Sequence, residues 1–122
     1  MIKGTGCDII EIERVGAAVA NKNFLERCFS SLEISMFEDR GSVSFLAKNF
    51  AAKEAVVKAA GRGFRGIWPK EIEVLRDNFG APYVVLTPAA VKALDISNSQ
   101  MIHISISDTD DMAMATAIIE NR

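Results

Sequence analysis

The chain has 122 residues, a net charge of −2 and hydrophobic residues at 49% of its positions. This size is typical of one domain, residues 1–122, and the composition is that of a folded globular protein. No apolar run approaches the roughly 18 residues of a membrane span, and no basic segment followed by an apolar one marks a signal peptide. Cys7 and Cys28 lie at no metal-ligand spacing, so we expect reduced thiols in a cytoplasmic protein.

The first predicted element is a strand over residues 2–10, followed by a helix over 11–21. With a period of two, Gly4, Gly6 and Asp8 share one face of the strand. The two glycines leave a bare strip that a ligand or another backbone can approach closely. Asp8 projects from the end of this strip, either into a site or as the cap of the following helix.

A short helix is predicted next. Ser30 or Ser31, with Glu33 shortly after, forms a helix-start signal, and the helix extends to about Arg40. Gly41 then ends it.

The longest predicted helix covers residues 45–60, with Ser44 as its cap and Gly61 at its C-terminal end. The alternative readings concern Glu54 and Lys58, which lie one turn apart. They form either an ordinary surface ion pair or part of a cleft. The alanines around Glu54 indicate a helix that packs closely against its neighbours, which favours the cleft.

The second half predicts mostly strands, over residues 71–76, 82–87, 101–107 and 112–119, with a short helix at Pro88–Leu94. His103, the only histidine, is predicted to be a hydrogen-bonded edge or interface residue. Residues 108–111 contain three aspartates, but the glycine and distal glutamate of a calcium loop are missing, so a turn is predicted.

Charge is distributed unevenly along the chain. Residues 40–70 contain seven lysines and arginines against one acid, Glu54, which suggests an anionic ligand or partner, although a charge run taken alone is more typical of a solvated helix face. Aromatic residues do not alternate with these cations, so a nucleic acid is not predicted.

If Asp8 and Glu54 converge, they form a site of hard oxygen ligands. Such a site suits Mg²⁺, which usually keeps several waters and binds substrate phosphates. Lys58 would then contact the same phosphates as a point charge.

These segments together resemble the two signatures of the 4'-phosphopantetheinyl transferases, in particular the small holo-acyl-carrier-protein synthases. The first signature matches at Gly4, Gly6, Asp8, Ile12 and Arg14. The second matches at Phe45, Leu46, Ala47, Phe50, Ala51, Lys53, Glu54, Ala55, Lys58, Ala59 and Gly61. Further matches are Gly80, Pro82, His103, Ser105, Ile106 and Ser107.

The resemblance implies an α+β fold, with a long central helix packed against an antiparallel sheet, and a homotrimer with sites between subunits. It also implies transfer of the 4'-phosphopantetheine arm of coenzyme A to a serine of apo-acyl carrier protein, with release of adenosine 3',5'-bisphosphate. Asp8 and Glu54 would hold Mg²⁺, Lys58 would contact phosphates, and Glu54 would serve as the base, directly or through water.

The resemblance also implies two sets of binding residues. Coenzyme A would be bound by Lys48, Lys58, Gly61, Arg62, Gly63, Pro82, Asp108 and Thr109. The acidic carrier protein would dock on Arg14, Lys22, Phe24 and Arg27.

Two departures concern the 3'-phosphate of coenzyme A. Asn49 stands where many relatives have arginine, and Asp108 stands where many have histidine, so Lys48 becomes the candidate replacement cation. Two rival functions stay open: a nonenzymatic coenzyme A or nucleotide-binding module, and a purely oligomerising domain.

Overall fold

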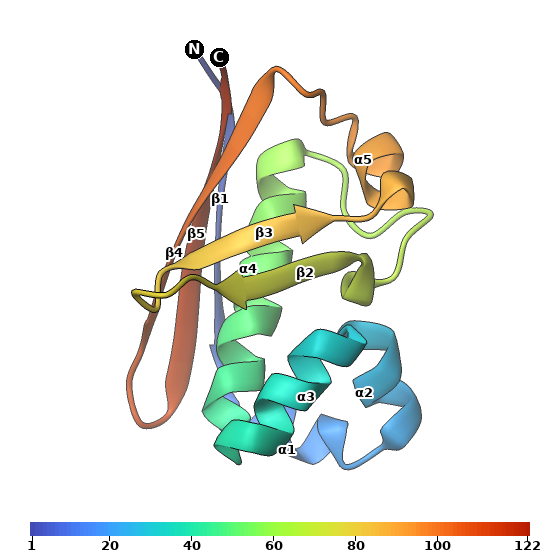
Figure 1. Cartoon of the computed structure of the whole chain (residues 1–122). Helices are drawn as coiled ribbons and strands as arrows, with labels where there is room; N and C mark the ends of the chain where they lie inside the picture. The colour runs from blue at the N-terminus through green and yellow to red at the C-terminus, as the bar shows by residue number, and fades with distance from the viewer.

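The computed structural model describes residues 1–122 and shows an α+β fold in which one long helix packs against two antiparallel sheets (Figure 1). The elements in chain order are β1 (Ile2–Glu11), α1 (Ile12–Val19), α2 (Lys22–Cys28), α3 (Ser31–Arg40), α4 (Val43–Ala60), a 3₁₀ turn η1 (Pro69–Glu71), β2 (Ile72–Arg76), β3 (Pro82–Leu86), α5 (Pro88–Leu94), β4 (Gln100–Asp108) and β5 (Met112–Asn121). The fold class expected from the sequence is confirmed.

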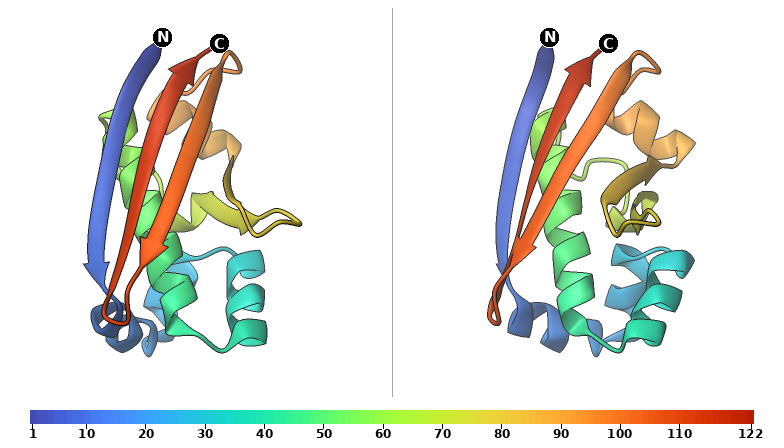
Figure 2. Two further views of the ribbon diagram at one scale, coloured as in Figure 1. Left: turned by 90° about the vertical axis from the view of Figure 1, so that its left-hand side faces the viewer. Right: turned by 60° about the vertical axis from the view of Figure 1, so that its left-hand side comes forward.

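The larger sheet has the strand order β1-β5-β4, so the first and last strands of the chain are neighbours. Figure 2 shows α4 lying across one face of this sheet, with the β2–β3 hairpin beside the helix and next to β4. The alanines of β5 that face α4 are fully buried, and the central core forms from them, α4 and β2. The opposite face of the sheet carries exposed side chains, among them Ile9, Met114 and Ile118.

The bare strip of β1 receives the backbone of α4 and not a ligand. A Cβ atom added to Gly4 would lie 2.0 Å from the carbonyl oxygen of Ala59, and one added to Gly6 would lie 2.2 Å from that of Ala55. Only glycine permits so close an approach. The contact places Asp8, two residues farther along the same face, beside α4.

The structure corrects the prediction of helices before residue 30. The first helix ends at Val19 and does not extend to residue 21. A second helix, α2, begins after Asn21, whose side chain accepts hydrogen bonds from the backbone N–H groups of Asn23 and Phe24. Asn21 therefore acts as a helix cap, a position that asparagine favours. Asp8 caps no helix, because Glu11 holds the N-cap position of α1 without a side-chain bond.

The start of α3 is as predicted and the start of α4 is not. The Ser30 hydroxyl accepts from the Glu33 N–H while the Glu33 carboxylate accepts from the Ser30 N–H, a complete capping box. The predicted cap Ser44 lies inside α4, which begins at Val43. Its hydroxyl instead donates to Asp108 Oδ2 at 3.0 Å.

The two cysteines are free thiols: Cys7 is exposed and Cys28 is buried. Burial raises the pKa of Cys28 to about 11, so this thiol stays protonated near neutral pH. None of the helices combines the length and the apolar character that crossing a membrane requires.

Candidate active site

A pocket of about 560 Å³ opens between β1, α1, α2 and α4. Its polar side is formed by Asp8, Arg14, Glu54 and Lys58, and its apolar side by Ile9, Ile10, Val15, Ala18, Phe24 and Phe50. The structure thus brings three residues that the sequence selected, Asp8 from β1 and Glu54 and Lys58 from α4, into one pocket.

Lys58 binds the residue that follows the glycine strip. Its Nζ atom donates to Asp8 Oδ1 at 3.1 Å and to the carbonyl oxygen of Cys7 at 3.0 Å. The hydrogen bond that Lys58 donates to the Asp8 carboxylate raises the pKa of Lys58, and the negative charge of Asp8 raises it further. Lys58 is therefore the cation of the pocket that pairs with Asp8 and not with Glu54, which lies one turn earlier on the helix.

Glu54 is a partly buried carboxyl group close to a second one. Burial raises the pKa of Glu54, the negative charge of Asp8 raises it further, and the positive charge of Lys58 opposes both effects. Asp8 and Glu54 are thus close enough to repel each other. A cation bound between them would relieve this repulsion.

The donor chemistry fits a hard divalent cation that also binds substrate. No group of three or more histidine, cysteine, aspartate or glutamate side chains is arranged so that it could hold a metal ion. Two carboxylates are too few for a closed protein cage, but they are the set that Mg²⁺ commonly takes when waters and phosphate oxygens complete its octahedron.

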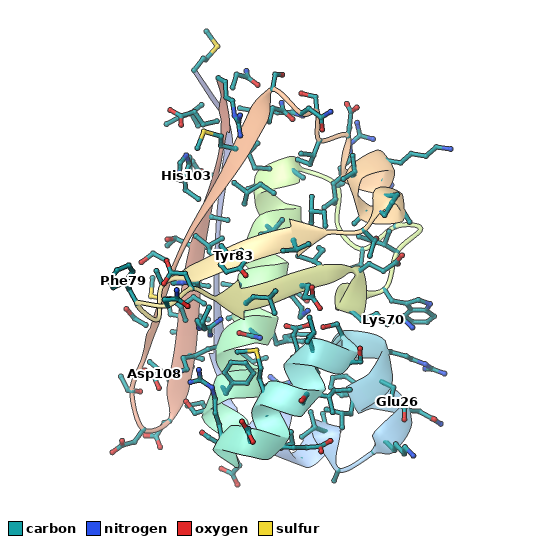
Figure 3. The ribbon with its side chains drawn as sticks, viewed as in Figure 1. Glu26, Lys70, Phe79, Tyr83, His103 and Asp108 are labelled. Carbon is teal, nitrogen blue, oxygen red and sulfur yellow. The ribbon has the colours of Figure 1, made fainter.

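A second group of predicted residues lies at the other edge of the large sheet. Asp108, at the end of β4, accepts from Ser44 and lies 3.9 Å from Lys48 Nζ. The Thr109 hydroxyl accepts from two backbone N–H groups in the β4–β5 turn. Figure 3 shows Asp108 on the same side of the molecule as Phe79, an exposed residue of the loop just before Pro82.

This second group does not join Asp8 within one chain. Asp8 pairs with Ala115 of β5, and Ala115 pairs with Ile106 of β4, so a whole strand separates the two edges. Adjacent strands are about 4.8 Å apart, which places the two edges roughly 10 Å from each other.

The predicted residues after α4 lie one turn beyond Lys58. Gly61 ends the helix in a left-handed conformation with φ of 73°, and Gly63 has φ of 71°. Arg62 points to Asp95, with 3.4 Å between its Nη2 atom and the carboxylate.

The four predicted docking residues are divided between α1 and α2. Arg14 and Phe24 line the pocket. Lys22 is an exposed residue of the first turn of α2, and the Arg27 guanidinium lies over the ring of Trp68 at 5.2 Å.

Asn49, the first of the two departures, lies inside the protein and is not exposed to a ligand. Asn49 is fully buried, where its amide donates to Glu33 Oε2 and to the carbonyl oxygen of Val74. Its Oδ1 accepts from Arg76 Nη2 at 2.9 Å. Asn49 therefore positions a guanidinium from β2 and does not supply a contact of its own.

Sequence reasoning missed a basic cluster around Phe45. The guanidinium carbons of Arg40 and Arg76 lie 5.0 and 5.2 Å from the centre of its ring. Burial lowers the pKa of Arg76, and the nearby charge of Arg40 lowers it further. Arg40 and Arg76 thus concentrate positive charge at Phe45. Lys48, one helical turn after Ser44, adds to it.

Comparison with known proteins decides the family. The model of the 4'-phosphopantetheinyl transferase superfamily matches residues 4–117. The chain belongs to this superfamily. Within it, the chain is an enzyme of the small holo-acyl-carrier-protein synthase class, since the holo-[acyl-carrier-protein] synthase of Clostridium botulinum strain Eklund 17B is 48% identical over 98% of each chain.

Solved structures of this class have the same fold. The holo-[acyl-carrier-protein] synthase of Neisseria meningitidis superimposes with a TM-score of 0.89 at 34% identity, covering 99% of this chain and 100% of that one. The Bacillus anthracis synthase, solved in complex with coenzyme A (3',5'-ADP), gives a TM-score of 0.84 at 31% identity, covering 100% and 99% of the two chains.

Proposed function

We propose that this chain transfers the 4'-phosphopantetheine arm of coenzyme A to a serine hydroxyl of apo-acyl carrier protein in a Mg²⁺-dependent reaction that releases adenosine 3',5'-bisphosphate. The observation that carries the proposal is the convergence of Asp8, Glu54 and Lys58 in one pocket. The names of the similar proteins supply the substrate and the acceptor.

The polar side of the pocket supplies the charges for phosphoryl transfer. Asp8 and Glu54 would hold the cation, whose chemistry is to neutralise charge on the pyrophosphate. Lys58 would bind a phosphate oxygen and stabilise the charge that develops on the leaving adenosine 3',5'-bisphosphate. Lys58 already donates to Asp8, so a modest change of its rotamer directs the same ammonium to a phosphate.

Glu54 is our choice for the group that accepts the serine proton. The serine oxygen forms a bond to the phosphorus of the arm as the bond to the leaving phosphate breaks, and the proton passes to Glu54. Glu54 lines the pocket beside Asp8 and Lys58, so a carboxylate is present there to take this proton, directly or through a water.

The coenzyme A site is proposed to lie between subunits of a homotrimer. Asp8, Glu54 and Lys58 lie at the β1 edge, while Lys48, Pro82, Asp108 and Thr109 lie at or near the β4 edge of the same sheet. A neighbouring copy whose β4 edge faces the β1 edge of the first would complete the ligand set, with Gly61, Arg62 and Gly63 close to Lys58. The exposed apolar residues on the outer face of the sheet are suited to such packing.

The 3'-phosphate of coenzyme A is proposed to bind the basic cluster of Arg40, Arg76 and Lys48. Asn49 accepts a hydrogen bond from Arg76. Arg76 can therefore supply the guanidinium that many relatives have at position 49. Asp108 reduces the positive charge, since it lies 3.9 Å from Lys48.

The carrier protein is proposed to dock on α1 and α2 in the cytoplasm. Arg14, Lys22 and Arg27 supply positive charge for an acidic partner, and Phe24 an apolar contact beside the pocket. The serine of the carrier would then enter the pocket from the side of α1, opposite Glu54.

Mass spectrometry of apo-acyl carrier protein after incubation with coenzyme A and Mg²⁺ tests the proposal. The expected gain is about 340 Da, the mass of the transferred arm. Asp8→Asn and Glu54→Gln keep side-chain shape but remove charge, so each should nearly abolish the gain while the protein stays folded.

Other results would favour the rival functions. Coenzyme A binding without any mass gain would indicate a nonenzymatic binding module. Absence of both binding and transfer, together with stable self-association, would indicate an oligomerising domain.

A further inference from the structure

Lys53, which immediately precedes Glu54 in α4, is a completely buried charged residue. Its Nζ atom donates to Glu33 Oε1 at 2.7 Å, to the carbonyl oxygen of Pro69 at 3.1 Å and to the carbonyl oxygen of Ile72. A lysine ammonium has three N–H donors, so every one has a partner. This side chain is therefore fixed in a single orientation.

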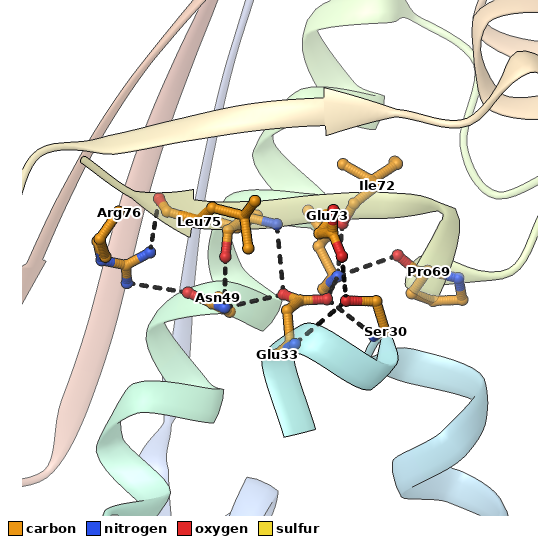
Figure 4. Close-up of polar contacts among 10 residues, drawn as sticks. Ser30, Glu33, Asn49, Pro69, Ile72, Glu73, Leu75 and Arg76 are labelled. Atoms are coloured by element: carbon orange, nitrogen blue, oxygen red, sulfur yellow. Dashed lines mark hydrogen bonds and ion pairs between the residues drawn. The ribbon is translucent and has the colours of Figure 1, made fainter. Parts of the chain in front are cut away.

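The partner carboxylate of Lys53 is equally saturated. Glu33 Oε1 also accepts from the backbone N–H of Ser30, and Oε2 accepts from Asn49 Nδ2 at 2.8 Å and from the N–H of Val74 (Figure 4). Lys53 and Asn49 lie four residues apart, on one face of α4. The network thus ties the helix at two successive turns to α3, η1 and β2.

The opposite side of α4 is fixed by the glycine strip. Gly6 contacts the backbone at Ala55, and Gly4 contacts it at Ala59. With polar ties on one side and backbone contacts on the other, α4 cannot rotate about its axis without breaking one set. Glu54 projects from the helix between these two restraints and into the pocket.

Rotation is the motion to which a metal ligand on a helix is most sensitive. A helix with its side chains has a radius of about 5–6 Å, so a rotation of about 10° moves a carboxylate at its rim by roughly 1 Å. Metal–ligand distances must be kept within about 0.2 Å of their preferred values. Small errors in the rotation of α4 would therefore separate Glu54 from a cation held at Asp8.

Stability gives no sufficient reason for burying this ion pair. Replacing a buried ion pair by apolar residues of similar size is often neutral or stabilising, because both charges lose their hydration. Consistent with that cost, burial lowers the pKa of Lys53, while the charge of Glu33 and its hydrogen bond oppose the change. The geometry of the pair suits orientation better than stabilisation.

We propose that Lys53 and Glu33 form a positioning pair that fixes the rotation of α4 and thereby sets Glu54 against Asp8 for binding the divalent cation. This inference rests on the proposed function, because it concerns the cation used in the transfer. Lys53 touches neither the substrate nor the cation, so its effect passes entirely through Glu54.

The test is the double variant Glu33→Gln/Lys53→Met. Both replacements are neutral, so no buried charge stays unpaired. The glutamine amide can donate to the carbonyl oxygens of Pro69 and Ile72 that lose the lysine. Mn²⁺ serves as the metal probe, with its binding to the folded protein followed by electron paramagnetic resonance. Thermal unfolding and the dependence of transfer on Mg²⁺ are measured on the same samples, with Lys92→Met, an exposed lysine of α5, as the matched control.

The expected result is a double variant that unfolds within a few degrees of the wild type but binds Mn²⁺ at least tenfold more weakly. Its kcat at low Mg²⁺ should fall by a similar factor and recover in part when Mg²⁺ is raised. Lys92→Met should match the wild type in all three measurements. Wild-type Mn²⁺ affinity in the folded double variant would overturn the proposal and leave the pair a structural role only.

A second variant decides the question if the double variant does not fold. Asn49→Leu removes the other polar tie and keeps Lys53 paired with Glu33, and it should weaken Mn²⁺ binding at least threefold. Unchanged binding would overturn the proposal. Failure of the proposed function is recognised separately, because wild-type protein would then show neither Mn²⁺ binding that depends on Glu54 nor transfer.

Discussion

The contact between β1 and α4 makes a sharp prediction for Gly6→Ala. The new Cβ atom would lie 2.2 Å from the carbonyl oxygen of Ala55 and 2.7 Å from the backbone nitrogen of Ala59. Ordinary van der Waals contact begins at 3.4 Å, so strand and helix must separate by 3.4 − 2.2 = 1.2 Å. Overpacking that side chains can absorb costs about 1–3 kcal/mol. Here only backbone can move, so we expect a loss of at least ~3 kcal/mol from a total of about 5–15 kcal/mol.

Thermal unfolding and transfer kinetics measure the two consequences of Gly6→Ala. A loss of about 3 kcal/mol lowers the Tm of a chain of this size by roughly 10–15 °C. Displacement of Asp8 by about 1 Å should also reduce kcat/KM roughly 100-fold, measured at a temperature below the lowered Tm. Gly16→Ala is the matched control, because its Cβ meets only a Val43 methyl group at 3.3 Å inside a helix and should leave both values near wild type. Wild-type Tm and turnover in Gly6→Ala would refute the reasoning.

Four further predictions concern single charges. The pKa of Glu54 in the folded chain lies above its unfolded value of about 4.3. At pH values between the two, the folded chain binds more protons than the unfolded chain. The stability of the fold therefore falls as the pH rises through this range. Glu54→Gln should therefore raise the Tm in metal-free buffer at pH 7 while losing transfer; a lower Tm would contradict the assignment. Lys53→Met alone leaves the Glu33 charge buried and should cost about 3–5 kcal/mol in denaturant unfolding, far more than the double variant. Arg14→Glu should raise the KM for carrier protein but not for coenzyme A, and a carrier KM that does not change with salt would place docking elsewhere. Arg76→Gln should lower kcat/KM for coenzyme A roughly tenfold or more and leave dephospho-coenzyme A nearly unchanged, since a charge-assisted contact is worth about 1.5–3 kcal/mol; equal losses for both substrates would exclude the proposed phosphate contact.

Local patterns were enough to predict most elements of the fold. The alternation of β4 and β5, the Ser30–Glu33 capping box and the glycine at the end of α4 are each decided by residues within a few positions of one another. Asn21 is equally local, and its capping role could have been found from the sequence. The polar face of the pocket was selected from motif spacing, and its assembly depended on the glycine strip.

Other features depend on contacts that spacing does not encode. Asn49 is buried by contacts with Glu33, Val74 and Arg76, which lie 16 to 27 residues away in the sequence. The saturation of Lys53 likewise needs η1 and β2 to fold over α4. Side chains of this kind are buried or exposed according to the packing of elements, which local periodicity does not predict.

The pairing of β1 with β5 has a consequence for folding during translation. Ile2 pairs with Glu120, and the backbone N–H of Asn121 donates to the carbonyl oxygen of Met1 at 2.8 Å. At translation rates of about 5–20 residues per second, β5, the only sheet neighbour of β1, is completed roughly 6–24 s after β1. During that time α4 is the one long element against which β1 can pack. Because residues 1 and 121 lie side by side, a circular permutant can join β5 directly to β1 and place its new termini at the β2–β3 turn. The two strands would then be consecutive in sequence, the loop closed by their pairing would be shorter, and the permutant should fold faster.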